Sequence, residues 1–584
     1  MGQNNQKSIF LSDISLDEVP DEINSICVTK GMGYDNIPPK IIKWAPHLFG
    51  PILLSIFNKC LHLGHYPNAM KIARVVPIHK GGDINDINDY RPISVLTQFN
   101  RLFERILASR LMDFFEKNKI ITSKQFGFMK KHSTEHAILD LKEYITQNLT
   151  NKKITAVLFL DLKKAFDSVS HPILLNKLSH HGIRGAPHAL LASYLSGRRQ
   201  YTSVNGFKSD LDFIRWGVPQ GSVLGPLLFL LFINDLPNSC NLNSWLFADD
   251  TALAESSDNF HDLQCHMNRE IQKLQNWLQA NLLSVHYVKK TQYILFMPRG
   301  KEKDKPPDFE IKMGEHIIEE TTTYKYLGVI IDDKLNWKPQ IDRMCAKMSS
   351  VCGIISKVRH ILDRNSMLMI YNGLVENRLR YGILSWSTAS NEQLNRLKVL
   401  QNRALRYIDF SPIGTTILPI YAQFNVLPLS NLIDLHRATY MFSLSNNNLP
   451  LVFRSYCEKP THGYATRFSE TNFAIPKHKT RLSETSIKYL GPSIWSKIPI
   501  HLKKLQFRKT FSNHLKQLYL DDLPTVKRTK ELDLNKSDLE NSKNNGQLQI
   551  IVEENNETIV VIENSFSLED IFEENDDDFH FTGF

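Results

Sequence analysis

Apolar residues follow different periods in successive parts of the chain. Residues 12–75 carry apolar positions at helical spacing, interrupted by prolines, and predict a series of short helices. Between residues 74 and 296, short apolar runs alternate with amphipathic stretches, which is typical of an α+β domain. The helical period dominates again from about residue 355 to 444. We therefore predict an α+β body followed by a helical region.

Two predicted strands end on carboxylates. Residues 154–160 form a continuous β-favouring run that predicts a buried strand, and this run ends on Asp161. An amphipathic helix is predicted after it, over about residues 165–178. Residues 244–254 predict a β-hairpin whose tip carries the pair Asp249–Asp250.

The chemistry of these carboxylates points to metal ions. Adjacent carboxylates repel one another and are costly to bury without compensation. Mg²⁺ favours such oxygen ligands together with substrate phosphates, and two ions about 4 Å apart stabilise both oxygens of an in-line phosphoryl displacement. An Asp-Asp pair is also common in ordinary turns, so the spacing alone leaves both interpretations open.

The charge is unevenly distributed along the chain. The net charge is +9, but the residues from Asp521 onward include 17 acidic and 5 basic side chains, against 44 acidic and 65 basic ones before them. A body with this excess predicts a polyanionic partner, usually nucleic acid, although a basic protein that is merely soluble has the same composition. The acidic segment, rich in Asn, Asp and Glu, predicts disorder.

Cysteine usage and the N-terminal sequence indicate a compartment. The seven cysteines are scattered, without a CxxC pair or paired Cys/His spacing, so no zinc finger is predicted and a reducing compartment fits. The first residues lack a signal-peptide pattern, and the longest apolar run, Leu227–Ile233, is too short to span a bilayer. We expect an intracellular, soluble protein of the nucleus, the cytoplasm or both, with no membrane partner.

Six motifs, taken in order, resemble those of reverse transcriptases from non-LTR, jockey-like retrotransposons. Any one of them is weak, but six in family order over most of the first 520 residues are specific. The motifs are Lys30-Gly-Met-Gly33-Tyr-Asp35 and Lys80…Tyr90-Arg91-Pro92 of the fingers, Asp161-Leu162-Lys-Lys-Ala-Phe166-Asp167 of motif A, Gly217-Val-Pro-Gln220-Gly221 of motif B, Phe247-Ala-Asp249-Asp250 of motif C, and Tyr326-Leu327-Gly328-Val329 of the primer-grip hairpin.

The resemblance implies an α+β, right-handed polymerase fold of fingers, palm and thumb with an antiparallel palm sheet. The implied divisions are a helical N-terminal extension of the fingers in residues 1–70, fingers and palm in 71–300, the primer-grip hairpin and a helical thumb or connector in 301–455, a small C-terminal segment in 456–520, and a disordered acidic tail in 521–584.

The resemblance also implies an RNA-directed DNA polymerase, a nucleotidyltransferase that extends a DNA 3′-end along an RNA template. Two Mg²⁺ ions, or Mn²⁺ in their place, would be held by Asp161, Asp249, Asp250 and the backbone carbonyl of Leu162. The expected partners are an RNA template, a DNA primer or target DNA, and deoxynucleoside triphosphates.

Four residues would then bind the incoming nucleotide. Lys80 and Arg91 would neutralise the triphosphate, because an ammonium and a forked guanidinium both suit phosphate oxygens. Gln220 would contact the nucleotide and template. Phe166 would lie under the sugar and exclude a ribose 2′-hydroxyl. Ordinary surface charge at Lys80 and a plain core aromatic at Phe166 are the alternatives.

Further roles are implied downstream. Lys290 is the first candidate, and Lys289 the second, for a proton donor to the leaving pyrophosphate. Leu327 and Gly328 would grip the primer. Asp167 is interpreted as structural.

The sequence departs from the family in places. Met129 stands where the family usually has arginine, and His286 replaces the usual asparagine. We expect no endonuclease typical of the class in this chain. These departures favour an alternative, a catalytically impaired or domesticated RNA- or DNA-binding protein derived from such an element.

Overall fold

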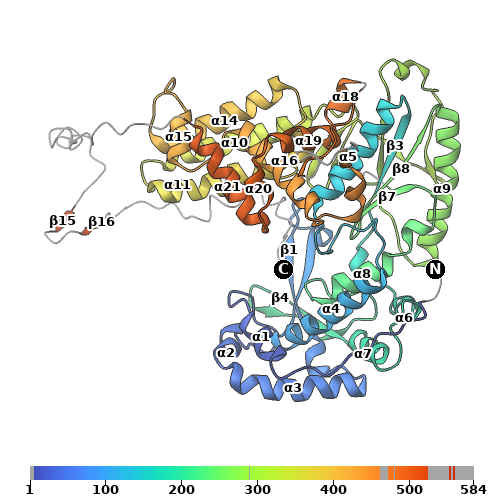
Figure 1. Cartoon of the computed structure of the whole chain (residues 1–584). Coiled ribbons are helices and arrows are strands. Elements are labelled where there is room, and N and C mark those ends of the chain that lie inside the picture. The colour runs from blue at the N-terminus through green and yellow to red at the C-terminus, as the bar shows by residue number, and fades with distance from the viewer. Residues whose placement is uncertain are drawn as a thin grey trace.

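The computed structural model describes residues 5–287, 290–460, 471–478 and 480–523, together with the backbone of 551–553 and 557–559. Figure 1 shows a sheet-containing body, a group of N-terminal helices at its base and a helical lobe that projects from its upper part. None of the described helices is both long and apolar enough to cross a membrane.

The N-terminal part combines helices with a small mixed sheet. Strand β1 (Ile72–His79) is antiparallel to β2 (Tyr90–Val95) and parallel to β4 (Arg199–Val204). Short strands β5 (Phe207–Lys208) and β6 (Asp212–Phe213) both pair with β4. The helices are α1 (Glu18–Asn24), α2 (Pro39–Trp44), α3 (Pro46–Leu63) and α4 (Gln98–Asn118), with 3₁₀ turns η1 (Asn68–Lys71) and η2 (Ile87–Asp89).

A five-stranded sheet forms the centre of the body, in the order β12-β9-β3-β8-β7. Strand β3 (Ile154–Leu160) is antiparallel to both β8 (Asp250–Ser257) and β9 (Gln292–Phe296). Strand β7 (Asn243–Phe247) forms a hairpin with β8, and β12 (Glu319–Glu320) runs parallel to β9 at the other edge.

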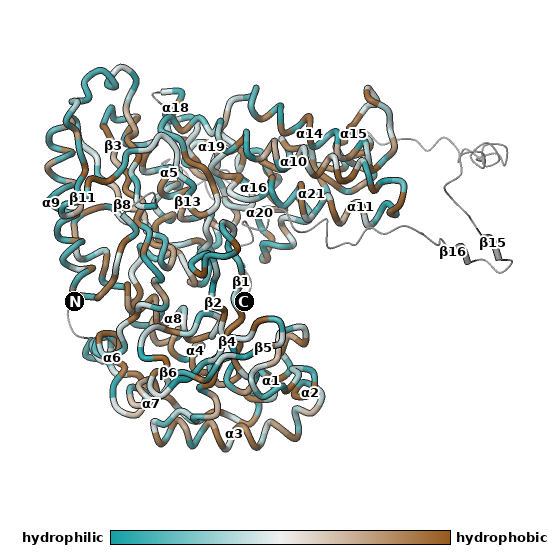
Figure 2. The backbone as a smooth tube through the Cα atoms, turned by 180° about the vertical axis from the view of Figure 1, so that it is seen from behind, coloured by the Kyte–Doolittle hydropathy of each residue, from teal (hydrophilic) through white to brown (hydrophobic). Residues whose placement is uncertain are grey.

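Helices cover both faces of this sheet, which explains the continuous apolar run of β3. Phe159 belongs to a hydrophobic core shared with α5 (Thr134–Thr150), whereas Leu158 belongs to a second core shared with α9 (Phe260–Ala280). Because side chains alternate between the faces of a strand, a strand covered on both sides is uniformly apolar. Figure 2 shows hydrophobic segments running through this body, seen from behind.

The remaining elements complete the body and the lobe. Those of the body are η3 (Ala165–Ser168), α6 (His171–His180), α7 (Ala186–Leu195), α8 (Leu224–Ile233), η4 (Leu236–Asn238), η5 (Lys301–Asp304), β10 (Lys312–Met313) and β11 (His316–Ile317). The lobe contains β13 (Thr323–Tyr326), β14 (Val329–Asp332), α10 (Lys338–Val358), α11 (Arg364–Tyr371), the π-helix η6 (Asn372–Glu376), α12 (Asn377–Arg380), α13 (Ile383–Trp386), α14 (Asn391–Asp409), α15 (Leu418–Gln423) and α16 (Leu429–Ser445). The C-terminal elements are η7 (Leu451–Ser455), α18 (Arg481–Glu484), α19 (Ile487–Lys497), α20 (Ile500–Lys503) and α21 (Arg508–Asp521), with the strand pair β15 (Ile551–Glu553) and β16 (Glu557–Ile559) beyond them.

The C-terminal helices dock on α5 through a buried ion pair. Lys142 Nζ lies 2.9 Å from Glu143 Oε1 and donates to the Thr485 carbonyl oxygen at 2.6 Å. The Glu143 carboxylate accepts hydrogen bonds from the Ser486 hydroxyl and from the Ile487 backbone N–H at the start of α19. These contacts fix the C-terminal helices to the central body.

The α+β class is confirmed, and two local predictions are wrong. The helix expected over residues 165–178 is a 3₁₀ turn followed by α6, which begins only at His171 because Lys164 adopts a left-handed conformation and Pro172 favours a new helix start. The helical region expected over 12–75 gives way to strand β1 at Ile72. The predicted disorder after Asp521 falls almost entirely outside the described residues.

Candidate active site

Asp161 follows directly from the buried strand β3, and residues 284–286 hold its backbone. The Asp161 carbonyl oxygen accepts from His286 N at 2.9 Å, and its N–H donates to Thr291 Oγ1 at 3.3 Å. Leu162 is buried and pairs with Val285 in an isolated antiparallel bridge. The Leu162 carbonyl accepts no hydrogen bond from the described residues, so it is available to a ligand.

The β7–β8 hairpin brings its two carboxylates to the same end of the sheet. Phe247 pairs with Asp250, so the turn consists of Ala248 and Asp249. Because β3 pairs with β8 up to Leu160 opposite Thr251, the next residues along the two strands are Asp161 and Asp250. The three carboxylates predicted as a group therefore lie together at one end of the central strands β3 and β8.

Burial and the neighbouring carboxylates shift the pKa values of the two hairpin aspartates. Burial raises the pKa of Asp250 to about 7, with contributions from Asp249 and Asp161, while Arg91 acts in the opposite direction. Burial and Asp161 likewise raise the pKa of Asp249, again opposed by Arg91. A group of half-buried carboxylates, two of which have raised pKa values, forms a site that a divalent cation would stabilise.

The donor chemistry fits Mg²⁺. Within the described residues, no three His, Cys, Asp or Glu side chains already form a metal-binding group. Mg²⁺ needs only one or two carboxylates when phosphate oxygens and water complete its coordination. The oxygen-only set of Asp161, Asp249, Asp250 and the Leu162 carbonyl meets that requirement.

Cationic side chains gather beside the carboxylates. Burial lowers the pKa of Lys80, and nearby Arg91, Lys290 and Lys164 lower it further. Lys290 Nζ lies 3.9 Å from Asp161 Oδ2, and Arg91 stands on β2, opposite Ile78 of β1. A cluster of mutually repelling cations next to carboxylates suits a ligand that carries both metal ions and phosphates.

His286, one of the two residues that depart from the family pattern, lies at this site. Its Nε2 is 3.9 Å from Asp161 Oδ2. Burial and the cations Lys290, Lys163 and Lys80 lower its pKa, while Asp161 raises it. The lowered pKa favours the neutral ring. Lys289, the second candidate for the proton donor, lies outside the described residues.

Phe166 belongs to the 3₁₀ turn η3 that precedes α6, and Gln220 contacts the same turn. Gln220 Nε2 donates to both carboxylate oxygens of Asp167 at 3.0 Å, which fits the structural role expected of Asp167. Gly217 approaches the Asp167 backbone so closely that a Cβ atom on residue 217 would lie 2.7 Å from the Cα of Asp167. The half-buried Phe166 ring stacks on Phe229 of α8 with centroids 4.5 Å apart.

The β13–β14 hairpin exists, but its tip is enclosed. Leu327 and Gly328 form a two-residue turn with φ of 46° and 83°, a type I′ arrangement. Leu327 is buried, and its carbonyl oxygen accepts from the Tyr381 hydroxyl at 2.6 Å. Arg343 of α10 donates to the Gly328 carbonyl at 3.2 Å. The turn that was expected to grip a primer is thus held by the helical lobe.

Sequence reasoning missed two residues of this site. Tyr324 of β13 stacks on Phe159 with centroids 4.1 Å apart, and its hydroxyl donates to the Lys290 carbonyl. Burial raises the pKa of Tyr324, with contributions from Asp250 and Asp161, so the ring stands beside the carboxylates. Gln125 is the other, since its side chain holds the turn that carries Asp249.

Comparison with known proteins shows which family this chain is similar to. Residues 78–331 match the family described as "Reverse transcriptase (RNA-dependent DNA polymerase)". The chain is 30% identical over 474 residues to the "Probable RNA-directed DNA polymerase from transposon BS" of Drosophila melanogaster, covering 78% of this chain and 51% of that protein. It is 29% identical over 423 residues to the "RNA-directed DNA polymerase from mobile element jockey" of the same species, covering 70% of this chain and 45% of that protein.

A third relative is the "Probable RNA-directed DNA polymerase from transposon X-element" of Drosophila melanogaster, 30% identical over 390 residues, covering 65% of this chain and 42% of that protein. The chain spans about half the length of the curated relatives it matches. The resemblance to jockey-like elements that the motifs indicate is confirmed, and residues 78–331 of this chain form a region similar to the reverse transcriptase family.

Proposed function

We propose that this chain is an RNA-directed DNA polymerase that extends a DNA 3′-end along an RNA template and releases pyrophosphate. One observation carries the proposal. Asp161, at the end of β3, and Asp249–Asp250, at the tip of the β7–β8 hairpin, lie together beside a cluster of cations. Carboxylates for metal ions next to donors for phosphates are what nucleotidyl transfer requires.

The metal ligands would be Asp161, Asp249, Asp250 and the Leu162 carbonyl, with Mg²⁺ as the natural ion and Mn²⁺ as a substitute. When bound, two such ions stabilise charge on the attacking and leaving oxygens. The hydrogen bonds from His286 N and to Thr291 Oγ1 keep the Asp161 backbone in place, so its carboxylate is pre-organised.

The protein side chains would bind and orient the nucleotide. Lys80 and Arg91 neutralise its triphosphate. Lys290 holds a proton near the leaving group. Gln220, fixed by Asp167, contacts the nucleotide and template. Phe166, held by Phe229, closes the space that a ribose 2′-hydroxyl would need.

Under this proposal, the parts of the fold take the roles of fingers, palm and thumb. The β1–β2–β4 sheet and helices α1–α4 serve as fingers, the central sheet with α5 and α9 as palm, and the lobe from α10 to α16 as thumb or connector. The β13–β14 hairpin borders the carboxylates through Tyr324, so we assign the primer contact to the strands of this hairpin, with Leu327 and Gly328 shaping its turn.

A second candidate function is nucleic-acid binding without polymerisation. The observation in its favour is His286, a bulky ring 3.9 Å from Asp161 where the family usually has asparagine. Retention of all three carboxylates favours the enzyme, because a binding protein gains nothing from burying groups that repel one another.

Primer extension on an RNA template with Mg²⁺ and dNTPs tests the proposal. Wild-type protein should extend the primer, whereas Asp161→Ala and Asp249→Ala should abolish extension and retain binding to the RNA–DNA hybrid. Asp258→Ala, an exposed carboxylate beyond the far end of β8, is the matched control and should extend normally. Normal extension by Asp249→Ala would refute the site, and hybrid binding without extension by the wild type would favour the second candidate.

A further inference from the structure

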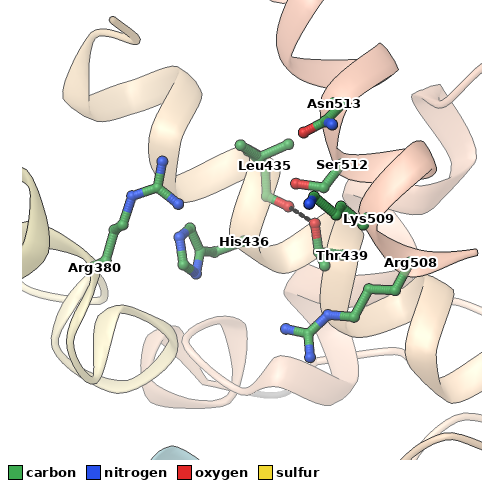
Figure 3. Close-up of a pocket in the computed structure, with 8 residues that line it drawn as sticks. All are labelled: Arg380, Leu435, His436, Thr439, Arg508, Lys509, Ser512 and Asn513. Atoms are coloured by element: carbon green, nitrogen blue, oxygen red, sulfur yellow. Dashed lines mark hydrogen bonds between the residues drawn. The ribbon is translucent and has the colours of Figure 1, made fainter. Parts of the chain in front are cut away.

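A basic pocket lies in the helical lobe, apart from the carboxylates. It has a volume of about 380 Å³, within the usual range for ligand sites, and is formed between α12, α16 and α21. Figure 3 shows Arg380 on one side, Arg508 and Lys509 on the other, and His436 between them. Thr439, Ser512 and Asn513 add polar atoms to its wall.

The charges of this pocket are poorly compensated. Arg380 pairs with Glu376, with Nε 3.0 Å from Oε1. Arg508 and Lys509 form no ion pair or hydrogen bond with any described residue, and no carboxylate lines the pocket. Burial, with Arg380 and Arg508 nearby, lowers the pKa of His436 to about 3, so the ring stays neutral. Two cations without an ion pair to any described residue, Arg508 and Lys509, opposite the paired Arg380, favour an anion in the cavity.

The donors suit phosphate. Two guanidinium groups present forked N–H donors, an ammonium adds a point charge, and the Ser512 hydroxyl and Asn513 amide supply neutral donors. Helices α12, α16 and α21 line the pocket, whereas Asp161 lies at the end of strand β3. The pocket is therefore a site separate from the one proposed for nucleotidyl transfer.

The chain next to Arg380 nevertheless contacts the β13–β14 hairpin, which borders the proposed active site. Tyr381, the residue after Arg380, donates to the Leu327 carbonyl of the β13–β14 hairpin and lies 3.2 Å from Thr134 Oγ1 at the start of α5. Burial raises the pKa of Glu135 to about 7, and Arg508 is near enough to oppose that rise. These contacts join the pocket wall to the β13–β14 hairpin, the element to which we assign the primer contact.

We infer that this pocket binds backbone phosphates of an RNA strand, as an anchor outside the active site. The inference rests on the proposed function for its choice of RNA as the phosphate source. The contact is to phosphate alone, so it would be independent of base sequence and sensitive to salt.

Fluorescence anisotropy with a labelled single-stranded RNA, in EDTA so that no extension occurs, tests the inference. The full-length double variant Arg508→Ala with Lys509→Ala should bind about tenfold more weakly, and the slope of log K against log [salt] should decrease by about 1.4, or about 0.7 for each lost phosphate contact. Arg508→Lys with Lys509→Arg should retain most of the affinity. The matched control, Lys59→Ala with Lys398→Ala, removes two exposed cations elsewhere and should bind like the wild type.

Other outcomes overturn the inference. Unchanged affinity and slope would mean that RNA does not reach the pocket. Tighter RNA binding by the pocket variant would mean that the pocket holds an acidic segment of this chain. A labelled nucleoside triphosphate serves as a second probe, and a loss confined to it would identify a free-nucleotide site. Because no extension is measured, the inference stands or falls separately from the polymerase proposal.

Discussion

The side-chain oxygen of Gln125 accepts a hydrogen bond from the backbone N–H of Ala248 at 3.1 Å. The same Oε1 atom accepts from Gly127 N at 2.8 Å. Ala248 has a φ of 55°, a left-handed conformation that is unfavourable for a residue with a Cβ, and it directly precedes Asp249. A residue far away in the sequence thus stabilises the strained turn that carries the catalytic carboxylates under our proposal.

Gln125→Ala should disturb this turn. It leaves two buried N–H groups without an acceptor, and each costs about 1–3 kcal/mol of unfolding free energy. Primer extension should fall by more than about tenfold, since a 1.4 kcal/mol change at the reacting centre is already a tenfold effect. Chemical denaturation and single-turnover extension measure the two consequences. Gln272→Ala, on the exposed side of α9, is the control, and equal extension by both variants would contradict the role of Gln125.

Phe166→Val should relax selection of the sugar. The smaller side chain opens the space that we assign to exclusion of the 2′-hydroxyl, so incorporation of ribonucleotides relative to deoxynucleotides should rise by about tenfold to a hundredfold. Competition between dNTP and rNTP at one template position measures this ratio. Phe229→Leu removes the stacking partner of Phe166 without opening that space, and should change stability more than selectivity. An unchanged ratio in Phe166→Val would leave Phe166 as a plain core aromatic.

The sequence predicts those parts of the site that depend on local pattern. The uniformly apolar run before Asp161 arises from a strand covered on both faces, and the alternation before Asp249 arises from a hairpin, so both are visible in the sequence alone. Tyr324 and Gln125 are not, because their roles depend on contacts with Phe159 and Ala248, which lie far away in the chain.

The same limit explains the errors. The sequence predicts the helix after Asp161 too early, since its apolar spacing continues through a 3₁₀ turn whose start depends on the left-handed Lys164. The Leu327–Gly328 turn is recognisable as a motif, but its enclosure by Tyr381 and Arg343 arises from helices that the motif does not contain.

The Lys142–Glu143 pair should behave as a unit. Lys142→Ala leaves a buried carboxylate without its cation, and Glu143→Ala leaves a buried ammonium, so each should lower the free energy of unfolding by about 3–5 kcal/mol. The double variant should lose clearly less than the sum, because neither charge then remains buried alone. Denaturant unfolding of the four proteins in the cycle measures the coupling. Additive losses would show that the two charges do not act as a unit.

Asp250 should make stability depend on pH and Mg²⁺ together. Burial, Asp249 and Asp161 raise its pKa from 3.8 to about 7 in the folded protein. Between these values the folded protein binds more protons than the unfolded chain, so this carboxyl makes stability fall as pH rises through that window. Above pH 7 the full penalty is present, and a cation that binds the carboxylates should offset it.

Asp250→Asn removes the ionisation and therefore the penalty. Without Mg²⁺ the variant should have a higher Tm than the wild type at pH 8, and the difference should vanish as pH approaches 4. Addition of MgCl₂ at pH 8 should raise the Tm of the wild type more than that of Asp250→Asn, while Asp258→Asn should respond like the wild type. Thermal unfolding at both pH values, with MgCl₂ or EDTA, measures all of these differences. If Mg²⁺ raised the Tm of wild type and Asp250→Asn equally, the cation would act elsewhere, and Asp250 would be a buried carboxylate without a metal-binding role.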